Sequence, residues 1–168
     1  MARLAHFLSI GNALLVAAAS ALLTQHSRLH QGATARVAAF NRAYDDAIRS
    51  GDNARVLALW TRDGVSLLPG QAALRGREAL ATFLAGVQAQ AAGWKVITQT
   101  STCHDIEVHG SWATEWCETH QVAARPAGQP NWEGWGKMAL ILRMSHGHWR
   151  IQQEMWNQAP PPPTAKQP

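Results

Sequence analysis

The spacing of apolar residues between positions 34 and 90 predicts three helices and one short strand. In the first helix, Thr34 to Ser50, apolar side chains recur every three or four residues, at Val37, Phe40, Tyr44, Ala47 and Ile48. Gly51 ends this helix, and Asp52 can cap a second one through NARVLALW. The segment GREALATFLAGVQAQ has the same helical period. Between these two helices, GVSLLPG predicts a strand that ends at its Pro-Gly pair.

After Gly93 the pattern changes to runs rich in Val, Ile, Thr and Trp, which predict four strands. The runs are WKVITQTSTCHDIEVHG, SWATEWCETHQVAARP, WEGWGKMALILRM and HWRIQQEMWNQ. Turn residues separate them, at Gly110-Ser111, at Pro126 to Pro130 and at His146-Gly147. Helices followed by an antiparallel sheet favour an α+β domain with the helices packed on one face. The tail APPPPTAKQP, residues 159–168, has no apolar pattern and is predicted to be extended and disordered.

Residues 1–30 are set apart from this pattern and indicate export. Arg3 precedes an uncharged stretch from Phe7 to Leu23, which contains the small-x-small sequence Ala19-Ser20-Ala21. The stretch is short for a membrane span, so we interpret it as an export signal cleaved near Ala21. The protein would then be periplasmic or secreted. The alternative is an uncleaved segment that anchors the protein to the membrane, which would be its only contact with a membrane.

Composition narrows the class of protein further. A chain of 168 residues is long enough for one domain with a core. Its net charge of +4 comes from scattered Arg and Lys without a basic stripe, which argues against nucleic-acid binding. Eight tryptophans stand against one tyrosine and three phenylalanines, so we expect several of them to line a cavity or an interface, with the others in the core.

The two cysteines, Cys103 and Cys117, lie on either side of the turn predicted at Gly110-Ser111. A three-residue loop would place them directly opposite each other, and a two-residue loop would put them one residue out of register. In an oxidising compartment they would then form a disulfide. The alternative is two buried free thiols that act as small apolar residues.

The order of these elements resembles the SnoaL-like proteins of the nuclear-transport-factor-2-like superfamily, from about Val37 to Asn157. The matching phrases are SGDNARVLALWTRDGVSLLPG, LRGREALATF, IEVHGSWATEW, GWGKMALILRM and GHWRIQQEMWN, in the family's order. The resemblance implies a SnoaL-like domain over residues 34–158: a cone in which a strongly curved antiparallel sheet wraps around about three N-terminal helices and encloses a cavity. Such proteins include ketosteroid isomerases, polyketide cyclases, dehydratases and domains that only bind or oligomerise, so the function has to be argued from the site.

A period of two along the strand WATEWCETHQV sorts its residues onto two faces. One set is Trp112, Thr114, Trp116, Glu118 and His120, and the other is Ala113, Glu115, Cys117 and Thr119. We predict that the first set faces the cavity, because burying two tryptophans stabilises the fold more than burying Ala and Thr. Glu118 and His120 would then be an acid–base pair on the cavity wall. The alternative is that both lie at a solvated rim.

The other candidate site residues come from the first helix and the last hairpin. Tyr44 lies on the inner stripe of the first helix and resembles the tyrosine that holds an oxyanion in ketosteroid isomerases, although we find no matching pair of aspartates. Lys137 and Glu154 are predicted to face each other across the hairpin as an ion pair, either a structural pair on the outer surface or a pair inside the cone. Inside the cone, that pair would orient a ligand. The tryptophans predicted to bind the ligand are Trp60, Trp112, Trp116 and Trp156.

These residues favour one function and leave two alternatives. The histidines show no ligand spacing of a known kind and no phosphate-binding loop is present, so we expect neither a metal nor a cofactor. The predicted function is an exported domain that binds a small, largely apolar organic molecule in a Trp-lined pocket, with a homodimer formed through the outer face of the sheet. One alternative is an isomerase, cyclase or dehydratase that uses Glu118 and His120. The other is a non-catalytic dimerisation module.

Overall fold

The computed structural model describes residues 25 and 31–163. The chain divides into two compact units, residues 1–35 and 36–168, and the fold below is that of the second unit. The predicted export segment lies outside the described residues except for Gln25, as does the tail beyond residue 163. Within the described part of the chain, no helix is both long enough and apolar enough to cross a membrane.

The three predicted helices are present. The first covers residues 31–50, and its part from residue 36 onward belongs to the domain. Helix α2 is Asn53–Ala58 and α3 is Gly76–Gln90. Asp52 caps α2 as predicted, because its side chain accepts hydrogen bonds from the backbone N–H groups of Ala54 and Arg55, at 2.9 and 3.2 Å.

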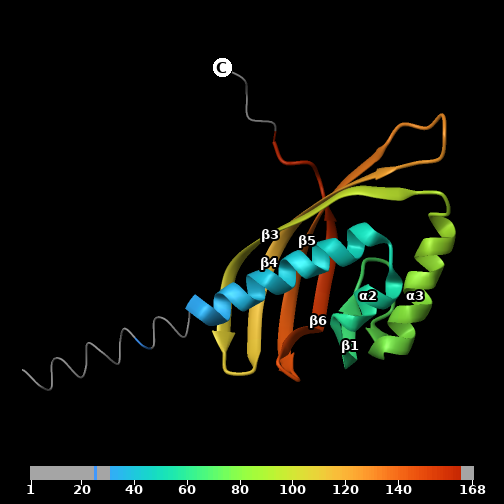
Figure 1. Ribbon diagram of the computed structural model, residues 1–168. Coiled ribbons are helices and arrows are strands. Elements are labelled where there is room, and N and C mark those ends of the chain that lie inside the picture. Colours follow the sequence, from blue (N-terminus) through green and yellow to red (C-terminus); the bar gives the residue numbers. More distant parts are fainter. Residues whose placement is uncertain (1–24, 26–30, 164–168) are drawn as a thin grey trace, which may run out of the picture. The chain divides into compact units, whose positions relative to one another are not determined.

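One curved sheet of six strands forms the other layer of residues 36–163 (Figure 1). The strands are β1 (Trp60–Leu67), β2 (Leu74–Arg75), β3 (Lys95–His109), β4 (Trp112–Ala124), β5 (Trp132–Ser145) and β6 (His148–Ala159). Their order across the sheet is β2-β1-β6-β5-β4-β3. The four C-terminal strands and the α+β class are confirmed. The sheet is mixed rather than purely antiparallel, because β1 runs parallel to β6.

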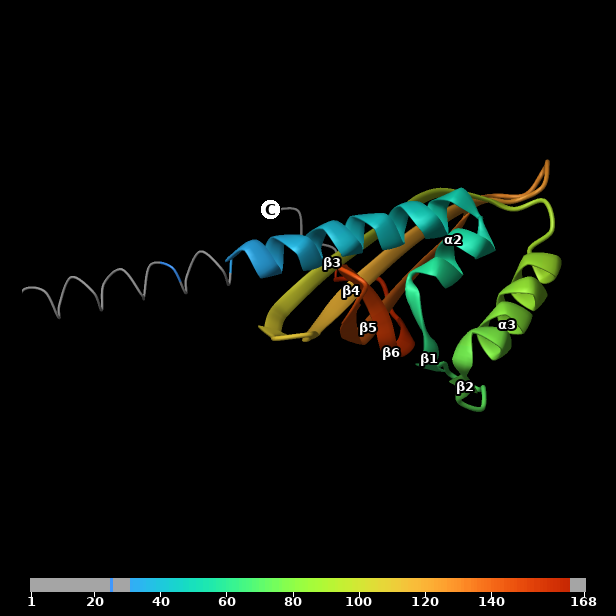
Figure 2. The same cartoon turned by 60° about the horizontal axis from the view of Figure 1, so that its bottom comes forward.

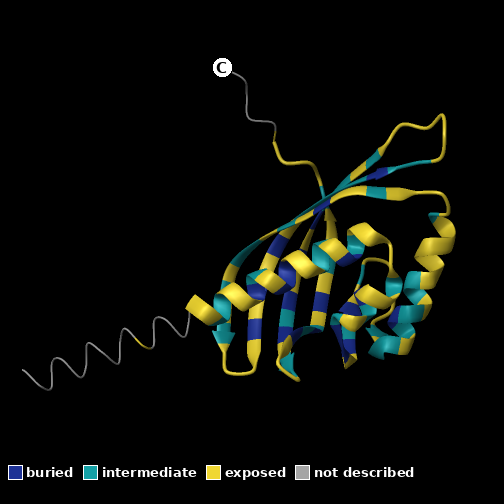
Figure 3. Cartoon of the chain, in the orientation of Figure 1, coloured by how far each residue is buried: buried dark blue, intermediate teal, exposed yellow. Residues whose placement is uncertain are grey.

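The helices cover one face of this sheet, which we call the inner face. Residues 36–50 lie across it, and α2 and α3 pack near β1 at its other end (Figures 1 and 2). Buried residues alternate with exposed ones along the strands beneath the helices (Figure 3). The core cluster is Val37, Phe40, Trp60, Leu80, Ala113, Cys117, Met138, Leu140, Leu142, Trp149 and Ile151.

The prediction of which β4 face turns inward is wrong. Ala113, Glu115 and Cys117 are buried on the inner face, whereas Trp112 and Trp116 are each 42% exposed on the outer one. The first helix passes close to β4: its Val37 and Phe40 share the core cluster with Ala113 and Cys117. Close packing places the small side chains of Ala113 and Cys117 beneath this helix, so side-chain area alone did not decide which face of β4 is buried.

A β-bulge brings the two cysteines together. The β3–β4 turn has only two residues, since His109 faces Trp112, and by that register Cys103 would miss Cys117 by one position. Between the pairs His104–Trp116 and Glu107–Thr114, however, β3 has two residues where β4 has only Glu115. The extra residue restores the register, so Cys103 faces Cys117 and the two form a disulfide. Asp105 in this bulge adopts a φ of 50°, a left-handed conformation that Asp tolerates.

Ile151 of β6 has no exposed surface, so its substitution measures how much the core contributes to the free energy of unfolding. Ile151→Ala should lower the free energy of unfolding by roughly 2–5 kcal/mol, because it removes buried methyl groups and leaves a cavity. The matched control is Ile97→Ala on β3, where the side chain is 46% exposed and the loss should stay below about 1 kcal/mol. Urea unfolding of both variants measures the difference. Equal losses would mean that Ile151 does not belong to the main core.

Candidate functional site

A second β-bulge, at Gln152 of β6, turns a carboxyl group into the domain. Leu142 of β5 faces Ile151 and Ile141 faces Gln153, so Gln152 between them has no partner. Before the bulge, Trp149 and Ile151 point into the core, at odd positions. After it the inward positions are even, beginning with buried Glu154. Bulges re-aim side chains in this way, and here the result is a carboxyl group on an apolar wall.

The same register separates Glu154 from Lys137. The hairpin turn has two residues, with Ser145 facing His148, and the bulge adds one more position. Glu154 therefore faces Leu140, and Lys137 faces Asn157. Lys137 is exposed on β5, while Glu154 is only 7% exposed. The predicted ion pair is wrong because the two side chains lie on opposite faces of the sheet.

Glu154 is held by two hydroxyl groups from other elements. The Tyr44 hydroxyl donates to Oε1 at 3.2 Å, and Ser66 Oγ donates to Oε2 at 2.9 Å. Tyr44 comes from the first helix, and Ser66 is the residue of β1 that faces Glu154 in the parallel pairing. Both carboxyl oxygens thus have partners although the group is removed from water, as buried polar groups require.

Burial favours the neutral form of both acids in this cluster. It raises the pKa of Glu154, and the hydrogen bonds from Ser66 and Tyr44 oppose that shift without reversing it. The pKa of Tyr44 is also raised well above its ordinary value, by burial first and then by the negative charge of Glu154. Tyr44 therefore remains a neutral donor, and Glu154 keeps its proton to a higher pH than an exposed glutamate does.

The cluster lies on the wall of a cavity of about 570 Å³. The lining is mostly apolar and comes from the first helix, α2, α3, β1 and the segment after it, β4 and β6. Its residues are Tyr44, Ile48, Val56, Trp60, Ser66, Leu68, Pro69, Gln71, Leu80, Phe83, Leu84, Val87, Gln121, Glu154, Trp156 and Gln158. A second hollow of about 400 Å³ shares five of these residues with the first and adds Trp132 and Trp135. The first cavity thus combines a mostly apolar wall with several polar side chains, as small-molecule sites do, and the second hollow is more polar.

Trp156 is placed on this wall by a glycine of the neighbouring strand. A Cβ atom on Gly136 would lie 2.5 Å from Trp156 Nε1 and 2.7 Å from Thr119 Oγ1, which is too close for either. The indole N–H donates to Thr119 Oγ1 at 3.4 Å. Gly136 therefore provides the space in which the ring packs against the sheet.

The predicted site residues separate into two groups. Tyr44, Trp60, Glu154 and Trp156 line the cavity. Trp112, Trp116, Glu118, His120 and Lys137 do not; all but Trp112 border a shallow outer hollow of about 370 Å³. There His120 Nε2 lies 2.8 Å from Glu133 Oε1, and Glu118 lies 3.6 Å from His104, so the predicted Glu118–His120 pair is not formed. Ser66 was missed, although a lone hydroxyl in the apolar strand GVSLLPG was a signal for it.

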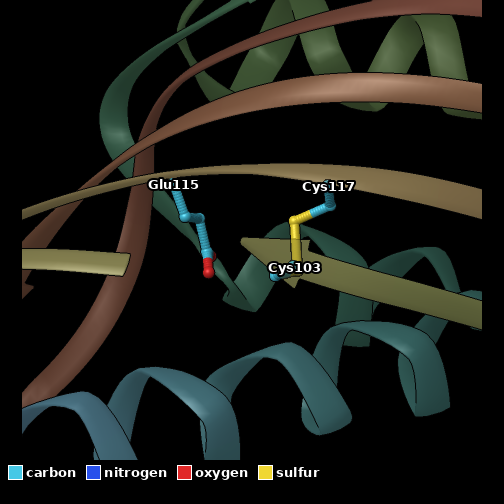
Figure 4. A group of neighbouring side chains, drawn as sticks. All are labelled: Cys103, Glu115 and Cys117. Atoms are coloured by element: carbon cyan, nitrogen blue, oxygen red, sulfur yellow. A yellow bond between two sulfur atoms is a disulfide. The ribbon is translucent and has the colours of Figure 1, made fainter. Parts of the chain in front are cut away.

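A second carboxyl group on the inner face also escaped the sequence reasoning. Glu115 of β4 is 5% exposed, and its Oε2 accepts a hydrogen bond from Asn41 Nδ2 at 2.8 Å. Its other oxygen, Oε1, is buried and has no hydrogen-bond partner among the described residues. Burial raises the pKa of Glu115 to about 7, against the opposing effect of the Asn41 hydrogen bond. The Cys103–Cys117 disulfide lies beside it on the same side of the sheet (Figure 4).

Residues 37–156 match the model of the SnoaL-like domain, so the chain belongs to this family. The match spans most of the domain described above and includes both inner-face carboxyl groups. No curated protein sequence matches the chain.

Solved structures share the fold at low sequence identity. A ketosteroid isomerase-like protein from Erwinia carotovora atroseptica has a TM-score of 0.64 and 22% identity, over 76% of this chain and 96% of that one. An NTF2-like protein with a cystatin-like fold from Novosphingobium aromaticivorans has a TM-score of 0.63 and 22% identity, over 85% and 92%. A candidate dehydratase of the NTF2-like family from Streptomyces avermitilis has a TM-score of 0.62 and 16% identity, over 76% and 97%. These likenesses show the α+β cone fold.

Glu115 should make stability depend on pH. Its pKa of about 7 in the folded state exceeds the ordinary value of 4.5. Between pH 4.5 and about 7 the folded state therefore binds more protons than the unfolded state does. The free energy of unfolding should therefore fall as the pH rises through this window, by roughly 2–3 kcal/mol from this group. Glu115→Gln, which cannot ionise, should remove that part of the slope in urea unfolding at pH 5 and pH 7.5. Parallel pH dependences of wild type and variant would contradict the assignment.

Gly136→Ala should displace Trp156 and lower the free energy of unfolding by about 1–3 kcal/mol. The reason is that the Trp156 ring and the Thr119 hydroxyl lie where the methyl group would go. The shift should appear as a change in near-ultraviolet circular dichroism as well as in urea unfolding. Gly86→Ala in α3 is the matched control, since nothing lies within 4 Å of its added Cβ. That substitution should be neutral or slightly stabilising. A neutral Gly136→Ala would show that the strand does not need the glycine.

Proposed function

We propose that the domain binds a small, largely apolar organic molecule in the inner cavity, with Glu154 as the hydrogen-bonding partner of a polar group on that molecule. The observation that carries this proposal is the position of Glu154: a buried carboxyl group, fixed by Tyr44 and Ser66, on the wall of an apolar cavity of about 570 Å³. A mostly apolar cavity with a fixed carboxyl group binds a ligand through buried apolar area, and the hydrogen bond to that group orients the ligand.

The chemistry of the wall indicates the class of ligand. Trp60, Phe83 and Leu84 contribute flat or branched apolar surface, and no Lys or Arg of the described residues lines the cavity. A ligand with a strong negative charge would find no cation there, and it would lie near a carboxyl group. The preferred ligand is therefore a neutral molecule with a ring or branched carbon skeleton and one or two carbonyl or hydroxyl oxygens.

A second candidate function is proton transfer at the same position, as in an isomerase or dehydratase. The raised pKa of Glu154 favours it, because a carboxyl group that keeps its proton to a higher pH can act as a general acid. Tyr44, kept neutral by its own raised pKa, can donate to an oxygen that gains charge. In this reading Glu154 and Tyr44 take the catalytic roles for which Glu118, His120 and Tyr44 were predicted from sequence.

We also propose that the domain works outside the cytoplasm and pairs with a second copy. The disulfide supports the first point, since such bonds persist in oxidising compartments. Exposed Trp112 and Trp116 on the outer face support the second, because large exposed apolar groups mark interaction surfaces.

Binding can be tested with 2-naphthol and naphthalene as probes of the cavity, followed by quenching of tryptophan fluorescence. Leu84→Trp fills the cavity from α3 and should weaken binding of both probes at least about tenfold. Ala85→Trp, on the exposed side of the same helix, is the matched control and should bind as wild type does. Equal binding by the two variants would place the probes elsewhere and remove the support for this site.

The role of Glu154 separates the two candidate functions. Glu154→Leu should weaken 2-naphthol binding by about five- to tenfold and leave naphthalene binding nearly unchanged, because only 2-naphthol can use the hydrogen bond. For proton transfer, exchange of the α-hydrogens of 2-tetralone in D₂O should be faster with wild type than in buffer, and Glu154→Gln should abolish the gain. If the probes bind but 2-tetralone exchanges its α-hydrogens no faster than in buffer, the domain binds ligands without catalysing proton transfer.

A further inference from the structure

We infer that the Cys103–Cys117 disulfide is a thiol–disulfide exchange site, in which an external dithiol attacks Cys103 and Glu115 protonates the Cys117 sulfur as it leaves. This inference goes beyond the proposed ligand pocket. It concerns different side chains on β3 and β4, and it holds whether or not the pocket binds a ligand.

The two sulfur atoms differ in their access to a reagent. Cys117 has no exposed surface, whereas Cys103 is half-buried and lines a surface hollow of about 230 Å³. The other lining residues are Ala38, Asn41, Arg42, Asp45, Ser101 and Ile106. We therefore place the attack of the thiolate at the Cys103 sulfur, which makes Cys117 the leaving group.

A buried leaving group needs a proton. Breaking the disulfide from the Cys103 side would put a thiolate at Cys117 within the apolar core cluster, where an unpaired charge is costly. Glu115 lies two residues before Cys117 on the same strand face, and one of its carboxyl oxygens lies within 4.8 Å of both sulfur atoms. Its Oε1 is buried and without a partner among the described residues. The carboxyl group is thus a proton donor placed beside the sulfur that requires one.

The surroundings keep that proton available. From the first helix, Arg42 and Asp45 are the charged groups at the hollow, and Asp45 is engaged with the backbone N–H and hydroxyl of Ser101, at 2.9 and 2.6 Å. On β5 the residue opposite Glu115 is Leu140, and on β3 the neighbours on this face are Cys103 and Ile106. Among the described residues, no ion pair joins Arg42 or another cation to the Glu115 carboxylate. Burial raises the pKa of Glu115 to about 7, so the acid is largely protonated below neutral pH.

Atoms and electrons balance over two exchanges. One thiolate of the dithiol bonds to Cys103 Sγ; the Cys103–Cys117 bond breaks with its electron pair on Cys117 Sγ, which takes the Glu115 proton. The second thiolate of the reagent then attacks its own sulfur in the mixed disulfide and releases Cys103, which is protonated from water. The reagent leaves as a disulfide, the protein gains two electrons and two protons, and Glu115 recovers its proton from solvent.

The test is reduction of the full chain by dithiothreitol between pH 5.5 and 8.5, followed by thiol alkylation and mass spectrometry. Rates are divided by the concentration of dithiothreitol thiolate at each pH, so that only the protein's own pH dependence remains. In wild type this corrected rate should fall as the pH rises through about 7, because the proton donor is lost. In Glu115→Gln it should be at least about tenfold lower at pH 6 and independent of pH.

Two further variants make the result specific. Asn41→Leu removes a hydrogen bond that lowers the pKa of Glu115, so the fall in corrected rate should move to higher pH. Glu107→Gln, an exposed glutamate of β3, is the matched control and should follow wild type. Unfolding curves of the same proteins establish that each variant is folded.

Site of attack is tested separately with glutathione disulfide. Cys117→Ser leaves Cys103 at the hollow and should form a mixed disulfide, whereas Cys103→Ser leaves a buried thiol that should not. The inference is overturned if wild type and Glu115→Gln have the same corrected rates, if Cys117 is the sulfur that reacts, or if reduction occurs only in urea concentrations that unfold the domain.

Discussion

The two β-bulges control which side chains enter the domain. A strand alternates strictly between two faces, so a single extra residue moves every later side chain to the opposite face. In β3 the extra residue lies opposite Glu115 and aligns Cys103 with Cys117. In β6 it is Gln152, which places Glu154 and Trp156 against the cavity after Trp149 and Ile151 have entered the core. Without the bulges, the disulfide and the pocket carboxyl group would both be out of place.

Both inner-face carboxyl groups depend on the first helix for a partner. Asn41 donates to Glu115 and Tyr44 donates to Glu154, and these two residues are one helical turn apart. The carboxyl groups themselves lie on either side of Leu140, which faces Glu115 on one strand and Glu154 on the other. Removing an ionisable group from water is costly, and the helix offsets part of that cost at both positions. The helix is thus a polar partner as well as an apolar cover.

The fold could be predicted from sequence because local patterns determine it. Helical spacing from Val37 to Ile48, the Asp52 cap and the strand-forming runs after Gly93 each specify an element, and the family resemblance supplies their arrangement. Tyr44, Trp60 and Trp156 were named from the sequence and line the cavity, as does Glu154, although its expected partner Lys137 lies on the other face. The resemblance to the SnoaL-like family is confirmed by the match over residues 37–156.

Which face of each strand is buried, and which residues pair across the sheet, could not be predicted in the same way. The sequence IQQEM does not mark its extra residue in any periodicity, so the Lys137–Glu154 pairing was misjudged. The sequence HDIEV likewise does not mark the extra residue of β3. Trp112 and Trp116 were expected inside because of their area, but the distance between helix and sheet is a property of the assembled layers. In the assembled layers Ala113 and Cys117 pack in the core, and the indoles of Trp112 and Trp116 lie on the outer face. Glu115 was overlooked for the same reason, since it belongs to the face that seemed to offer little burial.

The one-turn separation of Asn41 and Tyr44 has a consequence for communication within the domain. An α-helix moves as a rigid rod over a single turn, so any sliding or rotation that withdraws Tyr44 from one acid also disturbs Asn41 at the other. If proton loss at one acid moves the helix, proton occupancy at the other acid changes with it, and the effect is reciprocal. A ligand bound against the indole of Trp156 would then change how readily the disulfide is reduced. Reduction of the disulfide would in turn change the affinity of the domain for that ligand.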